Sequence, residues 1–292
     1  MGEINEIISQ IKVEEDIKEY IADVEQNYFE YLQLLTSYGE DFVKKFLHVY
    51  KDQEYMFSNQ MEGDSNLASM FRIHLSRYDD SIKRAVDLIR RDYAISAKDL
   101  HGIHKRVMRG EQREYIVKGR YRDNQAHVGY FTTNEQGERV GHIVYTPPPP
   151  EQVPEMMQEV LDFYNSCTDI NEQLDHPFLQ AAVTHALILH VQPYMDGNSR
   201  TARVLQHAKL WQHAYELHGI NLISPALYLS GQYSMSRKSY RGKVDLIDQN
   251  PFDSEAWNQW LNYSLSLMYS TLVHISEEIK TLKAMYDNSH RR

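Results

Sequence analysis

One segment, residues 190–203, constrains the fold of this chain more than any other. An apolar run, 178–189, precedes this segment, and an amphipathic run, 202–217, overlaps its end and continues beyond it. This order predicts a helix, a tight loop and the start of a second helix. The chain therefore has to turn sharply between two helices at this point.

The predicted loop and the first turn of the second helix carry small and charged side chains. They are Asp196, Gly197, Asn198, Ser199, Arg200 and Arg203. Two arginines at a helix start oppose the macrodipole, because free backbone amides already place partial positive charge there. The pattern is reasonable if amides and guanidiniums bind phosphate oxygens, with Asp196 holding the Mg²⁺ that accompanies a polyphosphate. A bare Arg-x-x-Arg usually marks a solvated helix face, but the preceding Asp-Gly-Asn favours a nucleotide-phosphate site.

The segment also resembles a known motif, the Fic family signature His-Pro-Phe-x-Asp/Glu-Gly-Asn-Gly-Arg-x-x-Arg. The matching positions are Pro193, Tyr194 (for Phe), Asp196, Gly197, Asn198, Arg200 and Arg203. Fic proteins typically transfer AMP from ATP to a hydroxyl side chain of a target protein. The resemblance implies Mg²⁺ on Asp196 and a phosphate nest at residues 197–199. It also implies outer phosphates on Arg200 and Arg203. Asp196, Asn198 and Arg200, with the residue at position 192, are then the catalytic residues.

Gln192 departs from this signature, because the catalytic His of the family falls on its position. In the family chemistry, that His accepts the proton of the target hydroxyl as the hydroxyl attacks the α-phosphorus. A glutamine can orient a hydroxyl by hydrogen bonding but cannot take its proton. General base catalysis is typically worth about 10²–10⁴-fold, so we expect slow transfer at most, with nucleotide binding retained. Ser199 replaces a family Gly, a smaller departure because Ser also starts helices well.

Two upstream histidines are candidates to replace the missing base. His190 lies two positions away, about 200° around a helix, and so should face away from the loop. His185 shares the face of Gln192 but lies about 10 Å away along the helix. We expect neither to act as the base. The remaining histidines at helical spacings lack metal-site partners in the sequence and are expected to be structural; they are His101, His104, His207, His213 and His218.

The one convincing β pattern lies between residues 114 and 146. Tyr115–Val117 and His142–Tyr145 are β-prone runs, and Asn134–Gly137 between them is turn-like. A proline run, 147–150, ends any strand. This pattern predicts a small β-hairpin.

Residues in and before this hairpin add to the family resemblance. Gly119, Tyr121 and Arg122, followed by Val128 and Gly129, resemble the Fic segment that leads into a hairpin called the flap. In the family, the flap docks the backbone of the target protein as an added strand. The resemblance therefore implies a protein target at the flap. Without it, the default interpretation would be a hairpin that covers a core edge.

A separate motif lies far upstream, at Ser58-x-x-x-Glu62-Gly63. It is similar to the inhibitory motif Ser/Thr-x-x-x-Glu-Gly/Asn of many Fic proteins, in which the Glu reaches the second signature arginine, here Arg203. A carboxylate at that arginine occupies the charge that would hold the γ-phosphate of ATP, and repels this phosphate. Alone, such a turn often just caps a helix. Combined with the signature, it predicts that Glu62 inhibits the site until it is displaced.

Composition narrows the class of protein further. A net charge of −10 over 292 residues argues against non-specific nucleic-acid binding and against attraction to anionic membranes. Cys167 is the single cysteine, so no intrachain disulfide forms, which suits a reducing cytoplasm. The first residues lack a signal-peptide pattern, and no apolar run reaches the roughly 18 residues of a membrane span. We expect a cytoplasmic protein whose oligomeric state is open and that could form a homo-oligomer.

Apolar spacings of three and four residues predict that most of the chain is helical. The predicted helices cover residues 4–34, 42–55, 66–89, 97–108, 151–165, 178–190, 201–218 and 254–286, with a short turn at 58–63. The expected fold class is mainly α, namely the Fic fold, a helical bundle with one small β-hairpin beside the active-site loop. We expect an N-terminal region (1–95) with the inhibitory motif, a Fic core (96–210), and C-terminal helices (211–292) packed on the core.

The leading functional hypothesis is a Fic-type protein adenylyltransferase that uses ATP and Mg²⁺, is inhibited by Glu62 and is impaired by Gln192. The main alternative is a nucleotide-binding pseudoenzyme that signals or scaffolds through the flap without chemistry. A third hypothesis is transfer of another phosphate-linked group, or removal of AMP with Glu62 orienting water. Removal ranks lower because it would also depend on the missing His.

Overall fold

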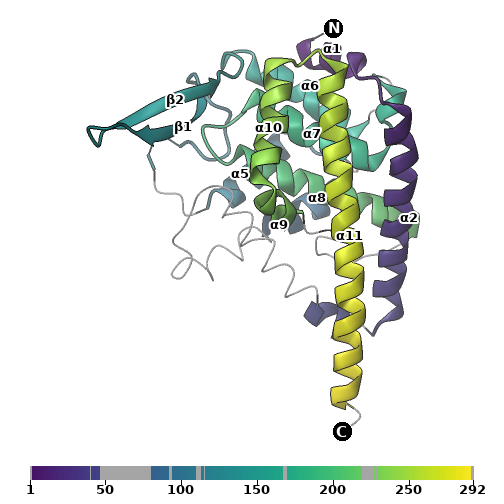
Figure 1. The fold of residues 1–292 in the computed structure, drawn as a ribbon. Coiled ribbons are helices and arrows are strands. Elements are labelled where there is room, and N and C mark those ends of the chain that lie inside the picture. The colour runs from purple at the N-terminus through teal and green to yellow at the C-terminus, as the bar shows by residue number, and fades with distance from the viewer. Residues whose placement is uncertain are drawn as a thin grey trace.

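Two helices, α7 (Pro177–Val191) and α8 (Asn198–His218), pack against each other at the centre of the fold (Figure 1). Every side chain of α7 from Phe178 to Val191 is buried, as expected for a helix whose sequence is apolar on all sides. The computed structural model describes residues 2–39, 41–46, 80–91, 94–109, 113–114, 116–166, 170–218, 227 and 229–290.

Shorter helices surround this central pair. They are α5 (Ala97–Val107), α6 (Val153–Asn165), the 3₁₀ turn η1 (Glu172–Leu174), α9 (Ser230–Met235) and α10 (Arg237–Gln249), with further helical residues at 41–46 and 80–91. Helices α6 and α10 pack against α7, and α5 packs against α8. The long C-terminal helix α11 (Ser254–His290) also contacts α7 and runs beside α2 (Figure 1).

The N-terminal pattern forms two helices, α1 (Glu3–Gln10) and α2 (Glu15–Ser37), where the spacing predicted continuous helix over 4–34. The break leaves backbone amides that need partners, and distant side chains supply them. The amide of Lys12 donates to Ser254 Oγ at 2.9 Å, and that of Val13 to Gln173 Oε1 at 3.0 Å. Because these partners lie far away in the sequence, local periodicity could not reveal the break.

The β-hairpin consists of β1 (Val128–Thr133) and β2 (Arg139–Tyr145), paired antiparallel around the predicted turn. It projects from the helical body, and β2 contacts α10 at its base (Figure 1). The prediction of a strand at Tyr115–Val117 is wrong, because Ile116 and Val117 are not in a strand. A short turn pairs the segments directly on either side of it, so the partner of β2 is 128–133.

The prediction of a mainly helical fold with one small hairpin is confirmed over the described residues. The ends of α5, α6, α7 and α11 agree with the predicted helices to within about four residues. None of the helices in the described part of the chain is both long and apolar enough to cross a bilayer.

Candidate functional site

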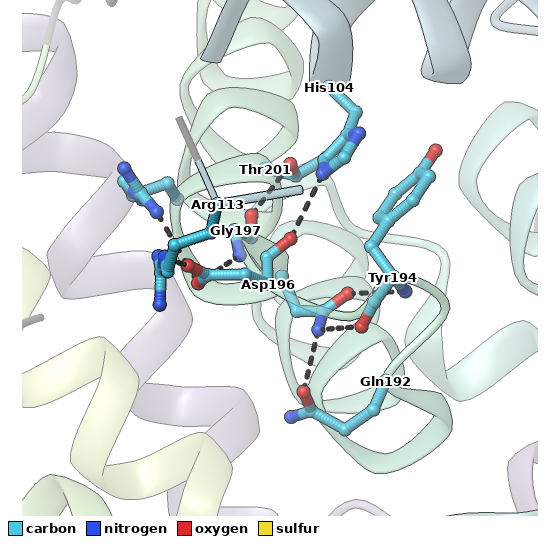
Figure 2. Close-up of polar contacts among 9 residues, drawn as sticks. His104, Arg113, Gln192, Tyr194, Asp196, Gly197 and Thr201 are labelled. Carbon is cyan, nitrogen blue, oxygen red and sulfur yellow. Dashed lines mark hydrogen bonds and ion pairs between the residues drawn. The ribbon is translucent and has the colours of Figure 1, made fainter. Parts of the chain in front are cut away.

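The loop between α7 and α8 begins at Gln192, which adopts the left-handed conformation (φ 46°, ψ 60°). It is the one non-glycine residue with positive φ among the described residues. Its amide N–H donates to Ile188 O at 2.9 Å, which closes the last turn of α7. Its side-chain Nε2 donates to Leu189 O at 2.8 Å. Its Oε1 accepts from Asn198 Nδ2 at 2.7 Å (Figure 2). Both ends of the Gln192 carboxamide are therefore hydrogen bonded.

Asn198, the first residue of α8, holds the loop in shape. Its Oδ1 accepts from the amide of Tyr194 at 2.9 Å, and its Nδ2 donates to the carbonyl of the same residue at 2.7 Å. The side chain is only 5% exposed. Because one carboxamide supplies the acceptor and both donors, no other residue type of this size satisfies all three contacts.

Arg122 caps the carboxyl end of α7 from the segment before the hairpin. Its Nε donates to Gln192 O at 2.8 Å and its Nη2 to Val191 O at 3.4 Å, with a further bond to Pro148 O. A buried cation at a helix C-terminus is favourable, because the last carbonyls carry partial negative charge. Arg122 also donates its backbone N–H to Pro193 O at 2.9 Å, so it fixes both the helix end and the loop.

Asp196 lies between two guanidiniums. Its Oδ1 is 3.4 Å from Arg200 Nη2 and accepts from the amide of Gly197 at 2.6 Å, while its Oδ2 pairs with Arg113 Nη2 (Figure 2). Sequence reasoning missed Arg113, because it lies 83 positions from Asp196 in a segment without helical or strand periodicity. The carboxylate predicted to bind Mg²⁺ is thus held by two arginines.

His104 of α5 supports the loop through a hydrogen bond and a ring contact. Its Nδ1 accepts from the amide of Gly119 at 2.9 Å, so Nε2 carries the ring proton and donates to Asp196 O at 3.0 Å. The ring stacks on Tyr194 with centroids 3.6 Å apart. Burial lowers the pKa of His104 to about 4, so the ring is neutral near pH 7. These contacts agree with the structural role expected for His104.

Two glycines are required by backbone geometry around His104. Gly197 has φ +80°, and a Cβ there would lie 2.5 Å from Met108 Sδ. Gly119 has φ +72°, and a Cβ there would lie 2.9 Å from His101 O. In both places a side chain would add a clash to an unfavourable backbone conformation. Gly197 thus lets the loop approach α5 closely.

The first turns of α8 bring positive charge to the same place. Arg203 is buried, with 1% exposure, and Arg200 is half-buried. The Nε of Arg200 is buried and has no hydrogen-bond partner among the described residues. A buried N–H without a partner is costly, and a ligand oxygen next to Arg200 would satisfy it. The helix start therefore fits an anion such as phosphate.

The donor set around Asp196 also fits Mg²⁺. This ion is usually held by one or two carboxylates together with substrate phosphates, and Asp196 provides a partly exposed carboxylate beside the positive helix start. Asp196 would hold the ion through its carboxylate, which Arg113 pairs with in this structure. Arg113 and Mg²⁺ would thus compete for the Asp196 carboxylate.

Neither upstream histidine lies in a position to act as the base. His190 faces away from the loop, since its Nδ1 lies 3.1 Å from Asp248 Oδ1 on α10 and 3.0 Å from Tyr145 Oη. His185 is fully buried, and its two ring nitrogens contact Gln206 and Tyr240. Burial lowers the pKa of His185 to about 3. Both residues are structural, in agreement with their predicted orientation and distance from the loop.

The predicted flap residues divide between two places. The segment before β1 contains Gly119, Tyr121 and Arg122 and packs against the loop. There the ring of Tyr121 lies 5.7 Å from that of Tyr194. Val128 and Gly129 begin β1 itself. The faces of the hairpin expose large apolar side chains; these are Tyr130, Phe131, Val140, Ile143 and Val144. The inhibitory motif at Ser58, Glu62 and Gly63 lies outside the described residues.

The model of the Fic/DOC family matches residues 94–210, which contain the hairpin and the loop. Among curated proteins, the chain is similar to the protein adenylyltransferase Fic of Drosophila willistoni, with 33% identity over 121 residues. The enzyme of the same name from Drosophila erecta is 33% identical over 123 residues. Each match covers 41% of this chain but only 20% and 21% of those relatives, so the chain spans about a fifth of their length.

Solved structures share the fold over most of the chain. A Fic family protein from Desulfovibrio desulfuricans superposes with a TM-score of 0.69 and 16% identity, covering 91% of this chain and 76% of its own. A Fic domain containing signaling protein from Bacteroides thetaiotaomicron gives a TM-score of 0.65 at 16% identity, covering 89% of this chain and 97% of its own. At this identity the likeness shows the fold, which is the Fic fold predicted above.

Proposed function

On the premise that residues 94–210 form a Fic/DOC family domain, we propose that this protein binds ATP on the 192–203 loop and transfers AMP to a hydroxyl of a target protein. One observation carries the proposal. Asp196, Gly197 and Arg200 meet at the start of α8, with the buried Arg203 one turn further on. A carboxylate, a close-approach glycine and two guanidiniums suit a metal-bound polyphosphate.

Each of these residues has a role in the proposed reaction. The amides of 197–199 and the guanidiniums of Arg200 and Arg203 bind phosphate oxygens and hold the α-phosphorus in place. Mg²⁺, bound through Asp196, would supply charge neutralisation for the phosphates. The target backbone would add to the hairpin as a further strand, which brings its hydroxyl to the loop. That hydroxyl oxygen attacks the α-phosphorus and pyrophosphate leaves.

Gln192 limits the rate of this reaction. No basic side chain at position 192 takes the hydroxyl proton, which must pass to solvent or to a phosphate oxygen instead. The loss of a general base typically costs about 10²–10⁴-fold. Glu62, if it reaches Arg203 as the motif predicts, would further restrain ATP binding. We therefore propose a slow, restrained transferase.

A second candidate, nucleotide binding without transfer, is favoured by the contacts of Gln192 itself. Its carboxamide oxygen accepts from Asn198 and its nitrogen donates to Leu189 O, and neither atom is a base that could take the proton of a hydroxyl. A protein of this kind would bind ATP and present the hairpin to a partner.

The deciding experiment is transfer of label from ATP labelled at the α-phosphate, with Mg²⁺ present. Two proteins are compared, Glu62→Gly and Glu62→Gly with Gln192→His, and Asp196→Ala in the second background serves as the inactive control. Labelling by the single variant supports the restrained transferase. Labelling by the double variant alone supports the binding protein. ATP binding by neither variant would refute both candidates.

A further inference from the structure

Three side chains with metal-ligating atoms meet where the N-terminal helix α2 packs on the core, outside the loop site. Glu25 comes from α2, His176 is the N-cap of α7, and His213 lies on α8. One ligand atom from each residue lies within 4.8 Å of the others. The expectation that His213 lacks a carboxylate partner is wrong, because Glu25 is supplied from 188 positions upstream.

The distances fit a single metal ion. Glu25 Oε1 lies 3.3 Å from His213 Nε2 and 3.6 Å from His176 Nε2. Ligands bound at about 2.0–2.1 Å in a tetrahedral site lie about 3.3–3.4 Å from each other. We propose that Glu25, His176 and His213 bind one divalent transition-metal ion of the Zn²⁺ class, with water as the fourth ligand. The proposal does not depend on the nucleotide site.

The surroundings hold the two imidazole rings in position. Tyr28 stacks on His213 with centroids 6.1 Å apart and planes 6° apart, and Phe178 meets the same ring edge-on at 5.5 Å. Phe178 also packs against His176, with centroids 5.1 Å apart. An apolar shell of this kind lowers the local dielectric and strengthens the bonds between a metal and its ligands.

The surroundings of His176 Nε2 also favour metal binding. Its Nε2 is buried without a hydrogen-bond partner in the described part of the chain, and Glu25 lies just beyond hydrogen-bond distance. Asp175 adds a further negative charge nearby, which attracts a cation.

Metal binding has an opposing cost at the same ring. The Nδ1 of His176 accepts from the amide of Phe178 at 3.3 Å, which places the ring proton on Nε2. On binding, that proton moves to Nδ1, Nε2 bonds to the metal, and the cap hydrogen bond is lost. A long cap bond stabilises far less than a metal–ligand bond, so the exchange favours the metal.

Bound there, the ion would join α2 to the helix that starts at the nucleotide loop. Glu25 is the one ligand from α2, and His213 lies on α8 beyond Arg200 and Arg203. The site would therefore fix the N-terminal helix against the core. Loss of the metal ion should loosen the packing of α2 on the core and leave the loop residues in place.

The test is a titration of the full chain, stripped with EDTA, with ZnCl₂ by calorimetry. We expect one ion per chain and a higher Tm in the bound protein. Glu25→Gln and His213→Ala should each weaken binding by at least about tenfold. The matched control is His274→Ala, because His274 and Glu278 form an exposed His–carboxylate pair 3.4 Å apart, and it should bind like the unmodified chain.

A second readout separates ligation from general stability. Co²⁺ bound to the same site should give the intense visible absorption of a tetrahedral complex, and Glu25→Gln should remove it. Glu25 is exposed enough for that change to leave the fold intact, which far-ultraviolet circular dichroism checks. Absence of saturable Zn²⁺ binding would overturn the proposal, as would binding that Glu25→Gln leaves unchanged.

Discussion

At the scale of single residues, position 192 decides what the loop can do. A carboxamide nitrogen has no basic lone pair, and the carboxamide oxygen of Gln192 already accepts from Asn198. The contacts that shape the loop, from Asn198 and Arg122, do not require a histidine at 192. The loop can therefore keep the geometry that is proposed to bind phosphate while lacking a proton acceptor.

Arg113 gives a prediction at the same scale. Its guanidinium pairs with the Asp196 carboxylate that is proposed to hold Mg²⁺, and both side chains are partly exposed. Such a pair is worth about 0.2–1 kcal/mol, so Arg113→Ala should raise the Mg²⁺-dependent affinity for ATP by up to about fivefold. Calorimetric Kd values with and without Mg²⁺, measured in the Glu62→Gly background, check this.

Arg109→Ala is the matched control for this experiment. Arg109 lies 3.5 Å from Asp80, and both side chains are exposed. The Arg109→Ala substitution removes the same charge as Arg113→Ala but should leave the ATP affinity unchanged. An affinity that falls in Arg113→Ala would mean that Arg113 binds phosphate instead of competing for Asp196.

At the scale of elements, the end of α7 depends on the segment before the hairpin. Arg122 places its guanidinium on the carbonyls of Val191 and Gln192, and its backbone amide on Pro193. The same segment contributes Gly119, whose amide fixes the tautomer of His104. The hairpin and the loop are therefore one structural unit, although about 60 residues separate them in the sequence.

We predict that Arg122→Lys weakens this unit. A lysine cannot reproduce the forked donors, so carbonyls at the end of α7 would lose their partners. The free energy of unfolding should fall by about 1–3 kcal/mol, measured by urea denaturation. Arg120→Lys alters an exposed arginine that pairs with Asp123, and should stay within about 0.5 kcal/mol of the unmodified chain. Equal losses in both variants would contradict the capping role.

The elements also show what the sequence could and could not predict. Helices with strong periodicity, such as α6 and α7, follow from it directly. The strand at 128–133 was readable from the turn at Asn134–Gly137, because a short turn pairs its immediate neighbours. The break between α1 and α2 was not readable, since Gln173 and Ser254 satisfy its amides from far away. Arg113 was missed for the same reason.

At the scale of the whole molecule, the two ends of the chain stabilise each other. Helix α2 packs along α11 (Figure 1). Tyr20 of α2 lies against Tyr269 of α11, with ring centroids 5.7 Å apart. The core on which they pack contains two buried histidines whose pKa burial lowers, His104 on α5 and His185 on α7. The N-terminal region is thus continuous with the core, and acid should affect all of it together.

Stability should therefore fall with pH below about 6.5. Burial lowers the pKa of His104 to about 4 and that of His185 to about 3, from an ordinary value of 6.5. The unfolded chain takes up these protons first, so each histidine contributes stability above pH 6.5 that is lost as pH falls toward its folded pKa. Within that window each should contribute a slope of about 1.4 kcal/mol per pH unit.

Urea denaturation at several pH values between 6.5 and 5 measures this slope, in a range where most carboxylates stay ionised. His104→Gln keeps a donor and an acceptor but does not titrate. The free energy of unfolding of this variant should therefore change less steeply with pH, by the contribution of one histidine. His274→Ala removes an exposed histidine and should keep the full slope. A free energy of unfolding that does not change with pH over this range would show that burial does not hold the two rings neutral. The tautomer assigned to His104 would then be wrong as well.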